Sequence, residues 1–141
     1  MKDIWGMMFA VAIVASISTL EPLLMPVVTQ WTPTKMHRDG NEIIISGYMK
    51  KTRNCEFIAV SATGTVLGQR DIVNVPLRFL DRPDGYTNVS RPVGMQEWGP
   101  WQIRLVSEVP ITQVGFRVTH SCHAVWNTVT HLGTVSVMSG Y

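Results

Sequence analysis

The feature that most constrains this chain is an uncharged run of seventeen residues near its N-terminus, Ile4 to Leu20. About 17 to 25 apolar residues can cross the hydrocarbon core of a bilayer as a helix. Trp5 lies where an interfacial aromatic side chain would anchor one end. Glu21-Pro22 follows, and because proline disfavours helix in the residue before it, we expect an interruption there. A second apolar patch, residues 23–28, either lies along an interface or packs on the rest of the chain.

Three interpretations of the apolar run compete. A cleaved signal peptide needs a basic start and a small-residue cleavage site, yet Asp3 offsets Lys2 and residues 16–18 match such a site weakly. A core or assembly helix would normally be amphipathic, whereas this run is apolar on all sides. We therefore favour an uncleaved anchor, with residues 1–30 as anchor and linker and residues 31–141 as one domain.

The body of the chain consists of short β-branched runs separated by turn residues, a pattern typical of strands. We expect strands within residues 42–49, 55–61, 66–68, 72–80, 100–106, 114–122 and 126–138. The clearest is 114–122, in which alternate residues share one face: Val114, Phe116, Val118, His120 and Cys122. Seven or eight such strands predict an all-β fold, an antiparallel sandwich preceded by one hydrophobic helix.

The two cysteines refine this prediction. Cys55 and Cys122 are 67 positions apart, each in an expected strand, which matches a disulfide between facing sheets in an immunoglobulin-like domain. The next tryptophan after Cys55 is Trp98, so the pattern resembles an immunoglobulin-like or fibronectin-like sandwich rather than an antibody domain. A disulfide requires an oxidising compartment or a virion surface, and two buried thiols are the alternative.

The orientation of the anchor follows from two opposing signals. Lys35 and Arg38 lie soon after the run, which favours a cytoplasmic C-terminus. That rule weakens when a whole domain follows, and the expected disulfide favours the opposite orientation. We expect a single-pass membrane protein with its C-terminal domain outside the cytoplasm, with a virion location as the alternative.

Residues 81–99 contain two prolines and three glycines, so we expect an irregular loop, and loops of this length are often functional. The region 81–101 collects side chains of the kinds that dominate protein interfaces: Arg82, Tyr86, Arg91, Trp98 and Trp101. Tryptophan faces can also stack on sugar rings. In the alternative interpretation, Trp98 and Trp101 plug the end of the sandwich, with their indole N–H groups bonded to loop carbonyls.

Other chemistry is poorly represented. A formal net charge of +2 is too small for nucleic-acid binding, and the basic stretch Lys50–Arg53 fits a solvated turn. There is no Gly-x-Ser-x-Gly motif, and we expect no enzymatic activity and no cofactor. His120 and Cys122 face one way from their strand and His123 the other, which supplies two ligands where structural zinc needs four. A periplasmic copper- or zinc-handling protein is kept as an alternative.

Two stretches carry a resemblance to a group of proteins. They are residues 91–101, Arg-Pro-Val-Gly-Met-Gln-Glu-Trp-Gly-Pro-Trp, and residues 119–126, Thr-His-Ser-Cys-His-Ala-Val-Trp. Together with the layout of one anchor and one β domain, they resemble small membrane-anchored proteins encoded by tailed bacteriophages. This resemblance implies a virion-associated or host-envelope role, and it implies no catalytic residues.

The sequence therefore predicts a non-enzymatic, membrane-anchored interaction module that binds a protein or an envelope glycan through loop 81–101. A second hypothesis is a structural subunit of a phage particle or membrane complex, whose N-terminal helix packs on neighbouring subunits.

Overall fold

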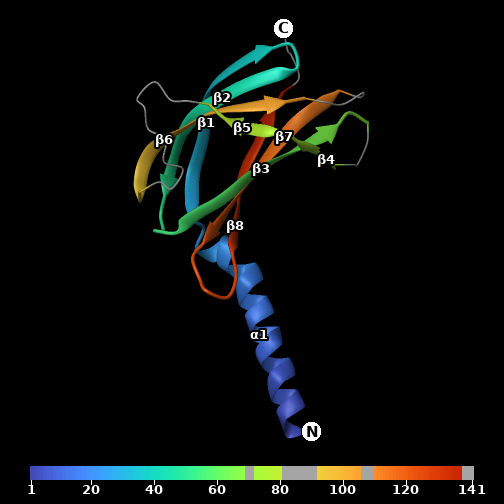
Figure 1. Ribbon diagram of the computed structural model, residues 1–141, viewed down its shortest axis with the longest axis vertical. Coiled ribbons are helices and arrows are strands. Elements are labelled where there is room, and N and C mark those ends of the chain that lie inside the picture. Colours follow the sequence, from blue (N-terminus) through green and yellow to red (C-terminus); the bar gives the residue numbers. More distant parts are fainter. Residues whose placement is uncertain (69–71, 81–91, 106–109, 138–141) are drawn as a thin grey trace.

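The computed structural model consists of a helix that projects from one end of a β domain (Figure 1). It describes residues 1–68, 72–80, 92–105 and 110–137. In chain order the elements are α1 (Lys2–Leu24), β1 (Val28–Asp39), β2 (Glu42–Lys51), β3 (Glu56–Val66), β4 (Ile72–Val75), β5 (Leu77–Phe79), β6 (Gly94–Arg104), β7 (Ile111–Ser121) and β8 (Thr128–Ser136).

Helix α1 is apolar all round and almost wholly exposed, with only 6% of its most apolar window buried. It is long and apolar enough to cross a membrane. The expected interruption at Glu21-Pro22 is wrong, because α1 continues through Pro22 to Leu24. The side chain of Glu21 is bonded to the β domain, and these bonds outweigh the local preference of a residue that precedes proline.

The folded domain begins earlier than the expected boundary at Trp31. Val27 and Val28 are buried, and β1 starts at Val28. The second apolar patch is therefore divided between two environments. Its first part, Leu23–Met25, stays exposed, and its last two residues belong to the core of the domain.

Two antiparallel four-stranded sheets form a sandwich. The first sheet has the order β1-β2-β6-β5 and the second has the order β4-β3-β7-β8. If the strands are lettered along the chain with β4 as C′, these orders are A-B-E-D and C′-C-F-G, as in immunoglobulin-like domains. The predicted fold class, an all-β sandwich of this kind preceded by one hydrophobic helix, is confirmed.

The core lies between the sheets and is built from their inward-facing alternate residues. The alternation expected for β7 is confirmed, since Val114, Phe116, Val118 and His120 are all buried. Four aromatic rings form the middle of the core, here called the aromatic centre: Trp31, Trp98, Trp101 and Phe116. The Trp31 and Trp98 rings are stacked with their centroids 4.8 Å apart.

The cysteines pair as predicted, but their bridge does not join the two sheets. Cys55 precedes β3 and Cys122 follows β7, and these neighbouring strands pair Glu56 with Ser121 in the second sheet. A bridge between sheets needs its first cysteine in the second strand, as in antibody domains, whereas Cys55 comes at the start of the third. The disulfide therefore fastens the ends of adjacent strands near α1.

The irregular structure expected for residues 81–99 is wrong for residues 94–99. Residues 94–101 belong to β6, which pairs with β2, while residues 81–91 lie outside the described residues. Gly99 was counted among the loop residues, but Gly99 and Pro100 are accommodated in a bulge opposite Ser46, where the register shifts between Ile45 and Gly47. Gly99 adopts a φ of +83°, which favours glycine at this point of the strand.

Candidate functional site

A cluster of polar side chains ties the end of α1 to the sandwich, and we call it the joint: Glu21, Arg53, His123, Trp126 and Thr128. Glu21 Oε1 accepts from Arg53 Nη1 at 2.6 Å, lies 2.7 Å from His123 Nε2, and accepts from Thr128 Oγ1 at 3.3 Å. Glu21 Oε2 accepts from the Trp126 indole at 2.7 Å. The carboxylate is 8% exposed, so a buried charge is satisfied here by directed partners.

The turn between β2 and β3 also holds the segment that links α1 to β1. Arg53 Nη1 donates to Met25 O at 3.0 Å, and Thr52 Oγ1 donates to Pro26 O at 2.6 Å. The Thr52 backbone N–H donates to Val27 O at 2.8 Å. With the helix end and the linker both bonded to the same turn, α1 is fixed to the domain rather than tethered by a free chain.

Two titratable side chains are buried between the sheets just above the joint. Lys51 is 2% exposed and donates to Cys55 O at 2.8 Å. His120 is 3% exposed, and its Nδ1 has no hydrogen-bond partner within the described residues. Burial lowers the pKa of Lys51. Burial, with a smaller contribution from the charge of Lys51, lowers the pKa of His120 to about 4, so this imidazole is neutral at physiological pH.

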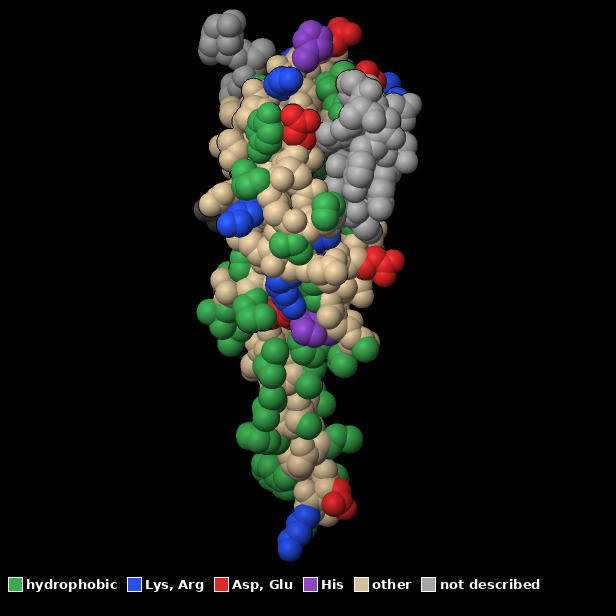
Figure 2. All heavy atoms as spheres, turned by 90° about the vertical axis from the view of Figure 1, so that its left-hand side faces the viewer, with side chains coloured by type: hydrophobic (Ala, Val, Ile, Leu, Met, Phe, Trp, Pro, Cys, Tyr) green, Lys and Arg blue, Asp and Glu red, His purple; other side chains and the backbone are tan. Residues whose placement is uncertain are grey.

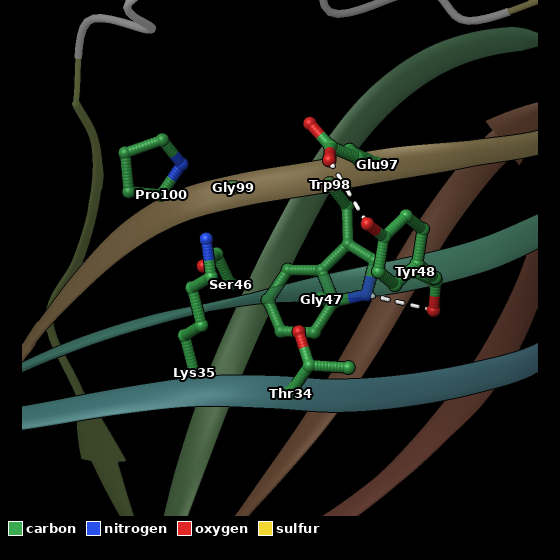
Figure 3. Close-up of a pocket in the computed structure, with 9 residues that line it drawn as sticks. All are labelled: Thr34, Lys35, Ser46, Gly47, Tyr48, Glu97, Trp98, Gly99 and Pro100. Carbon is green, nitrogen blue, oxygen red and sulfur yellow. Dashed lines mark hydrogen bonds between the residues drawn. The ribbon is translucent and has the colours of Figure 1, made fainter.

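A pocket of about 230 Å³ opens on the first sheet, and we call it the outer pocket: Thr34, Lys35, Ser46, Gly47, Tyr48, Glu97, Trp98, Gly99 and Pro100 (Figure 3). Its lining comes from β1, β2 and β6. The Tyr48 hydroxyl donates to Glu97 Oε1 at 3.2 Å, and the buried Trp98 indole donates to Tyr48 O at 3.0 Å. The pocket thus offers a cation, a carboxylate, hydroxyl groups and an aromatic ring at one place.

Two glycines allow the three strands to approach one another at the outer pocket. A Cβ at Gly47 would overlap the carbonyl oxygen of Thr32, and a Cβ at Gly99 would lie 2.8 Å from Ile45 O. Both strand pairs are irregular here, with register shifts on each side of β2. Bulges of this kind redirect side chains, and these turn the residues around Pro100 toward the pocket.

The candidate binding residues fall into two groups. Arg82, Tyr86 and Arg91 lie outside the described residues. Trp98 and Trp101 are 2% and 8% exposed, so most of each ring lies inside the sandwich, although Trp98 also forms part of the outer-pocket lining. Their rings both pack in the aromatic centre because the bulge at Gly99-Pro100 brings these two side chains, three positions apart, to the inner face of β6. The Trp98 indole N–H donates to the carbonyl oxygen of Tyr48 in β2, which agrees with the alternative that this ring fills the sandwich.

The histidines considered as metal ligands point to different environments. His120 lies inside the core and His123 bonds to Glu21 in the joint. Both cysteines are in the disulfide, so neither offers a thiolate. Across residues 1–68, 72–80, 92–105 and 110–137, no three His, Cys, Asp or Glu side chains gather into a group that could hold a metal ion.

The residues that form the joint and the outer pocket were not identified from the sequence. Glu21 was interpreted as an interruption, although a carboxylate directly after an apolar run needs partners wherever that run lies. Ser46 and Tyr48 alternate with the buried residues Ile43 and Ile45, so strand periodicity could have placed them on an outer face.

Comparisons with protein-family models, curated proteins and solved structures find no match to this chain.

Proposed function

We propose that this chain is a non-enzymatic interaction module, anchored in a membrane by α1 and folded outside the cytoplasm, that binds a protein or an envelope glycan through the outer pocket. The observation that carries the proposal is the joint, which fixes a membrane-length apolar helix to a disulfide-bonded sandwich. A domain held in this way presents one particular side to its surroundings. The disulfide supports an oxidising compartment for that domain.

Residues 97–100 are the part of region 81–101 that lines the outer pocket, and they support its use in partner binding. Glu97 and Pro100 line it, while Trp98 and Trp101 hold β6 from within. A volume of about 230 Å³ is below the range of roughly 300–1,000 Å³ typical of small-molecule sites. It suits one side chain or one sugar ring of a larger partner. Tyr48, which is 46% exposed, is the anchor residue that such a contact would use.

Cross-linking in intact cells tests the proposed partner binding. Full-length protein is recovered after cross-linking, and captured proteins and glycans are identified by mass spectrometry. We expect Tyr48→Ala and Glu97→Gln to abolish specific recovery, because they remove the ring and the charge at the pocket. Glu56→Gln, at an exposed position of the second sheet, is the matched control and should leave recovery unchanged. Equal recovery from all variants would exclude the outer pocket as the binding site.

Alkaline carbonate extraction tests the anchoring independently of any partner. A helix that crosses lipid stays with the membrane after extraction, whereas a helix that packs on neighbouring subunits follows the particle. Release of the full chain into the soluble fraction would favour the structural-subunit hypothesis instead.

A further inference from the structure

The end of the sandwich nearest α1 carries a second apolar feature besides the helix. The loop between β7 and β8, residues 122–127, lies beside the C-terminal turns of α1 (Figure 1). Val125 in this loop is 73% exposed, and Ala124 is exposed beside it. Leu23 and Leu24 at the helix end are 78% and 77% exposed. Figure 2 shows hydrophobic side chains along the helix and also on both sides of the level where it meets the domain.

The depth of this loop is set by its bonds to the helix. The His123 and Trp126 side chains both reach Glu21, at 2.7 Å each, so the residues between them are held at the level of the last helical turns. These bonds cannot be kept if the loop moves away along the helix axis. Val125 is therefore exposed because of a fixed geometry and not because the loop is unattached.

The length of α1 places that level at the membrane boundary. A helix rises about 1.5 Å per residue, so the hydrocarbon thickness of about 30 Å, measured from Ile4, reaches Leu23–Leu24. The carboxylate of Glu21 then lies at the edge of the hydrocarbon region, where it needs the partners that the joint supplies. Trp126, with its ring partly buried and its N–H on Glu21, has the amphipathic placement typical of interfacial tryptophan.

We infer that loop 122–127 is a second membrane contact, with Val125 inserted into the headgroup region of the same bilayer. This inference rests on the proposed anchoring by α1. The surface it meets is lipid, because the exposed Ala124 and Val125 continue the apolar surface of the helix. Arg53, on the turn after β2, is partly exposed and lies beside His123 of the loop, and Lys50 near the end of β2 is exposed; both cations suit anionic headgroups. The sandwich is thus seated on the membrane at two points.

Nitroxide-labelled lipid tests this contact in the full chain. The protein, with ¹⁵N-labelled valine, is placed in nanodiscs of phosphatidylcholine and phosphatidylglycerol that contain a lipid labelled near its headgroup. Val11 and Val14 report on the span and Val125 on the loop. Val73 is the control because it lies far from the helix end of the sandwich. It pairs with Gly64 of β3, and Gly64 lies eight positions along β3 from Glu56, which is next to the disulfide. At 3.3 Å per residue this is about 26 Å.

We expect Val125, like the span valines, to lose amide signal in the labelled nanodiscs, while Val73 keeps its signal. Loss at Val11 and Val14 with full retention at Val125 would overturn the loop contact and leave the anchoring intact, including the case in which a second copy covers the loop. Retention at all four valines would overturn the anchoring itself.

A substitution sharpens the test. With uniformly labelled protein, Val125→Asp should restore the Ala124 signal, because a carboxylate leaves the lipid. Ile72→Asp, at a position that is 69% exposed on β4, should change nothing at Ala124. Equal loss of the Ala124 signal in both variants would contradict insertion of Val125.

Discussion

The middle of the sandwich core and its end nearest α1 are held together by different physical means. The aromatic centre consists of stacked and tilted rings with a single indole hydrogen bond on a strand carbonyl from Trp98. The end nearest α1 contains buried charges, a buried histidine and the disulfide. Contact between apolar surfaces is insensitive to pH and redox state, whereas ion pairs and imidazoles respond to pH and disulfides respond to redox state. The difference implies that changes of pH or redox state act first on the end nearest α1.

The largest effect should come from the aromatic centre. Trp98→Ala removes a buried ring that touches Trp31 and Trp101, and such substitutions cost about 4 to 5 kcal/mol of unfolding free energy. Denaturant unfolding of the full chain in detergent, followed by circular dichroism of the strands, measures the loss. Trp126→Ala in the joint is the comparison and should cost only about 2 kcal/mol, the range of one hydrogen bond to a charge. Equal losses of unfolding free energy would remove the distinction between the aromatic centre and the joint.

Loss of the disulfide should have the second-largest effect on the free energy of unfolding. Replacing Cys55 and Cys122 together by alanine opens a loop of 67 positions, and the chain-entropy relation gives a loss of about 4 kcal/mol. The same unfolding measurement, with and without reductant, checks this value. Reductant should destabilise the parent protein and the Trp98→Ala variant by equal amounts and leave the alanine pair unaffected. A reductant effect on the alanine pair would contradict the assignment.

The pH dependence should report His120. The pKa of His120 is 6.5 in the unfolded state and about 4 in the folded state. Between pH 6.5 and pH 4 the unfolded state therefore binds a proton that the folded state does not bind. Stability should therefore fall as the pH drops from 6.5 to 4, by up to roughly 3 kcal/mol, and should not change from this source above pH 6.5. His120→Gln should flatten the difference in unfolding free energy between pH 6.5 and pH 4. A variant with an unchanged pH slope would show that another group is responsible.

The joint should contribute the smallest of the four effects. Glu21→Gln keeps an oxygen for the Trp126 indole but leaves Arg53 without its carboxylate, and Arg53 is 20% exposed, so water screens part of the loss. We expect a cost of about 1 to 2 kcal/mol. Hydrogen exchange should report it locally, as faster exchange at Met25 and Trp126 with no change at the buried Val114. Uniformly faster exchange would mean that the joint is not a separate structural unit.

Strand periodicity was sufficient to predict the fold class. The alternating burial of β7 is visible in its letters, and a buried alternate face in several short strands leaves few architectures. The cysteine pair was also predictable, but the strands that it joins were not. That assignment depends on where the third strand begins, and strand boundaries are the least certain part of such reasoning.

The errors have a common physical origin. Gly99 was expected in an irregular loop and the expected strand 55–61 ended before Gly64, yet both glycines lie inside strands where close contacts require them. A Cβ at Gly64 would press on Ile111 and Val75 at 2.9 and 3.0 Å, so glycine there permits close packing. The joint could not be predicted from the sequence for a similar reason, since Glu21 forms hydrogen bonds with residues more than 100 positions away. The sequence around Glu21 does not indicate such long-range contacts.

Under the proposed anchoring by α1, the joint makes the orientation of the sandwich depend on the bilayer itself. A spanning helix tilts when the hydrocarbon layer is thinner than its apolar length. Because α1 and the domain are bonded as one rigid body, that tilt acts like a lever and swings the outer pocket toward or away from the membrane plane. Lipid thickness would therefore decide which neighbours the pocket can reach, without any change inside the domain.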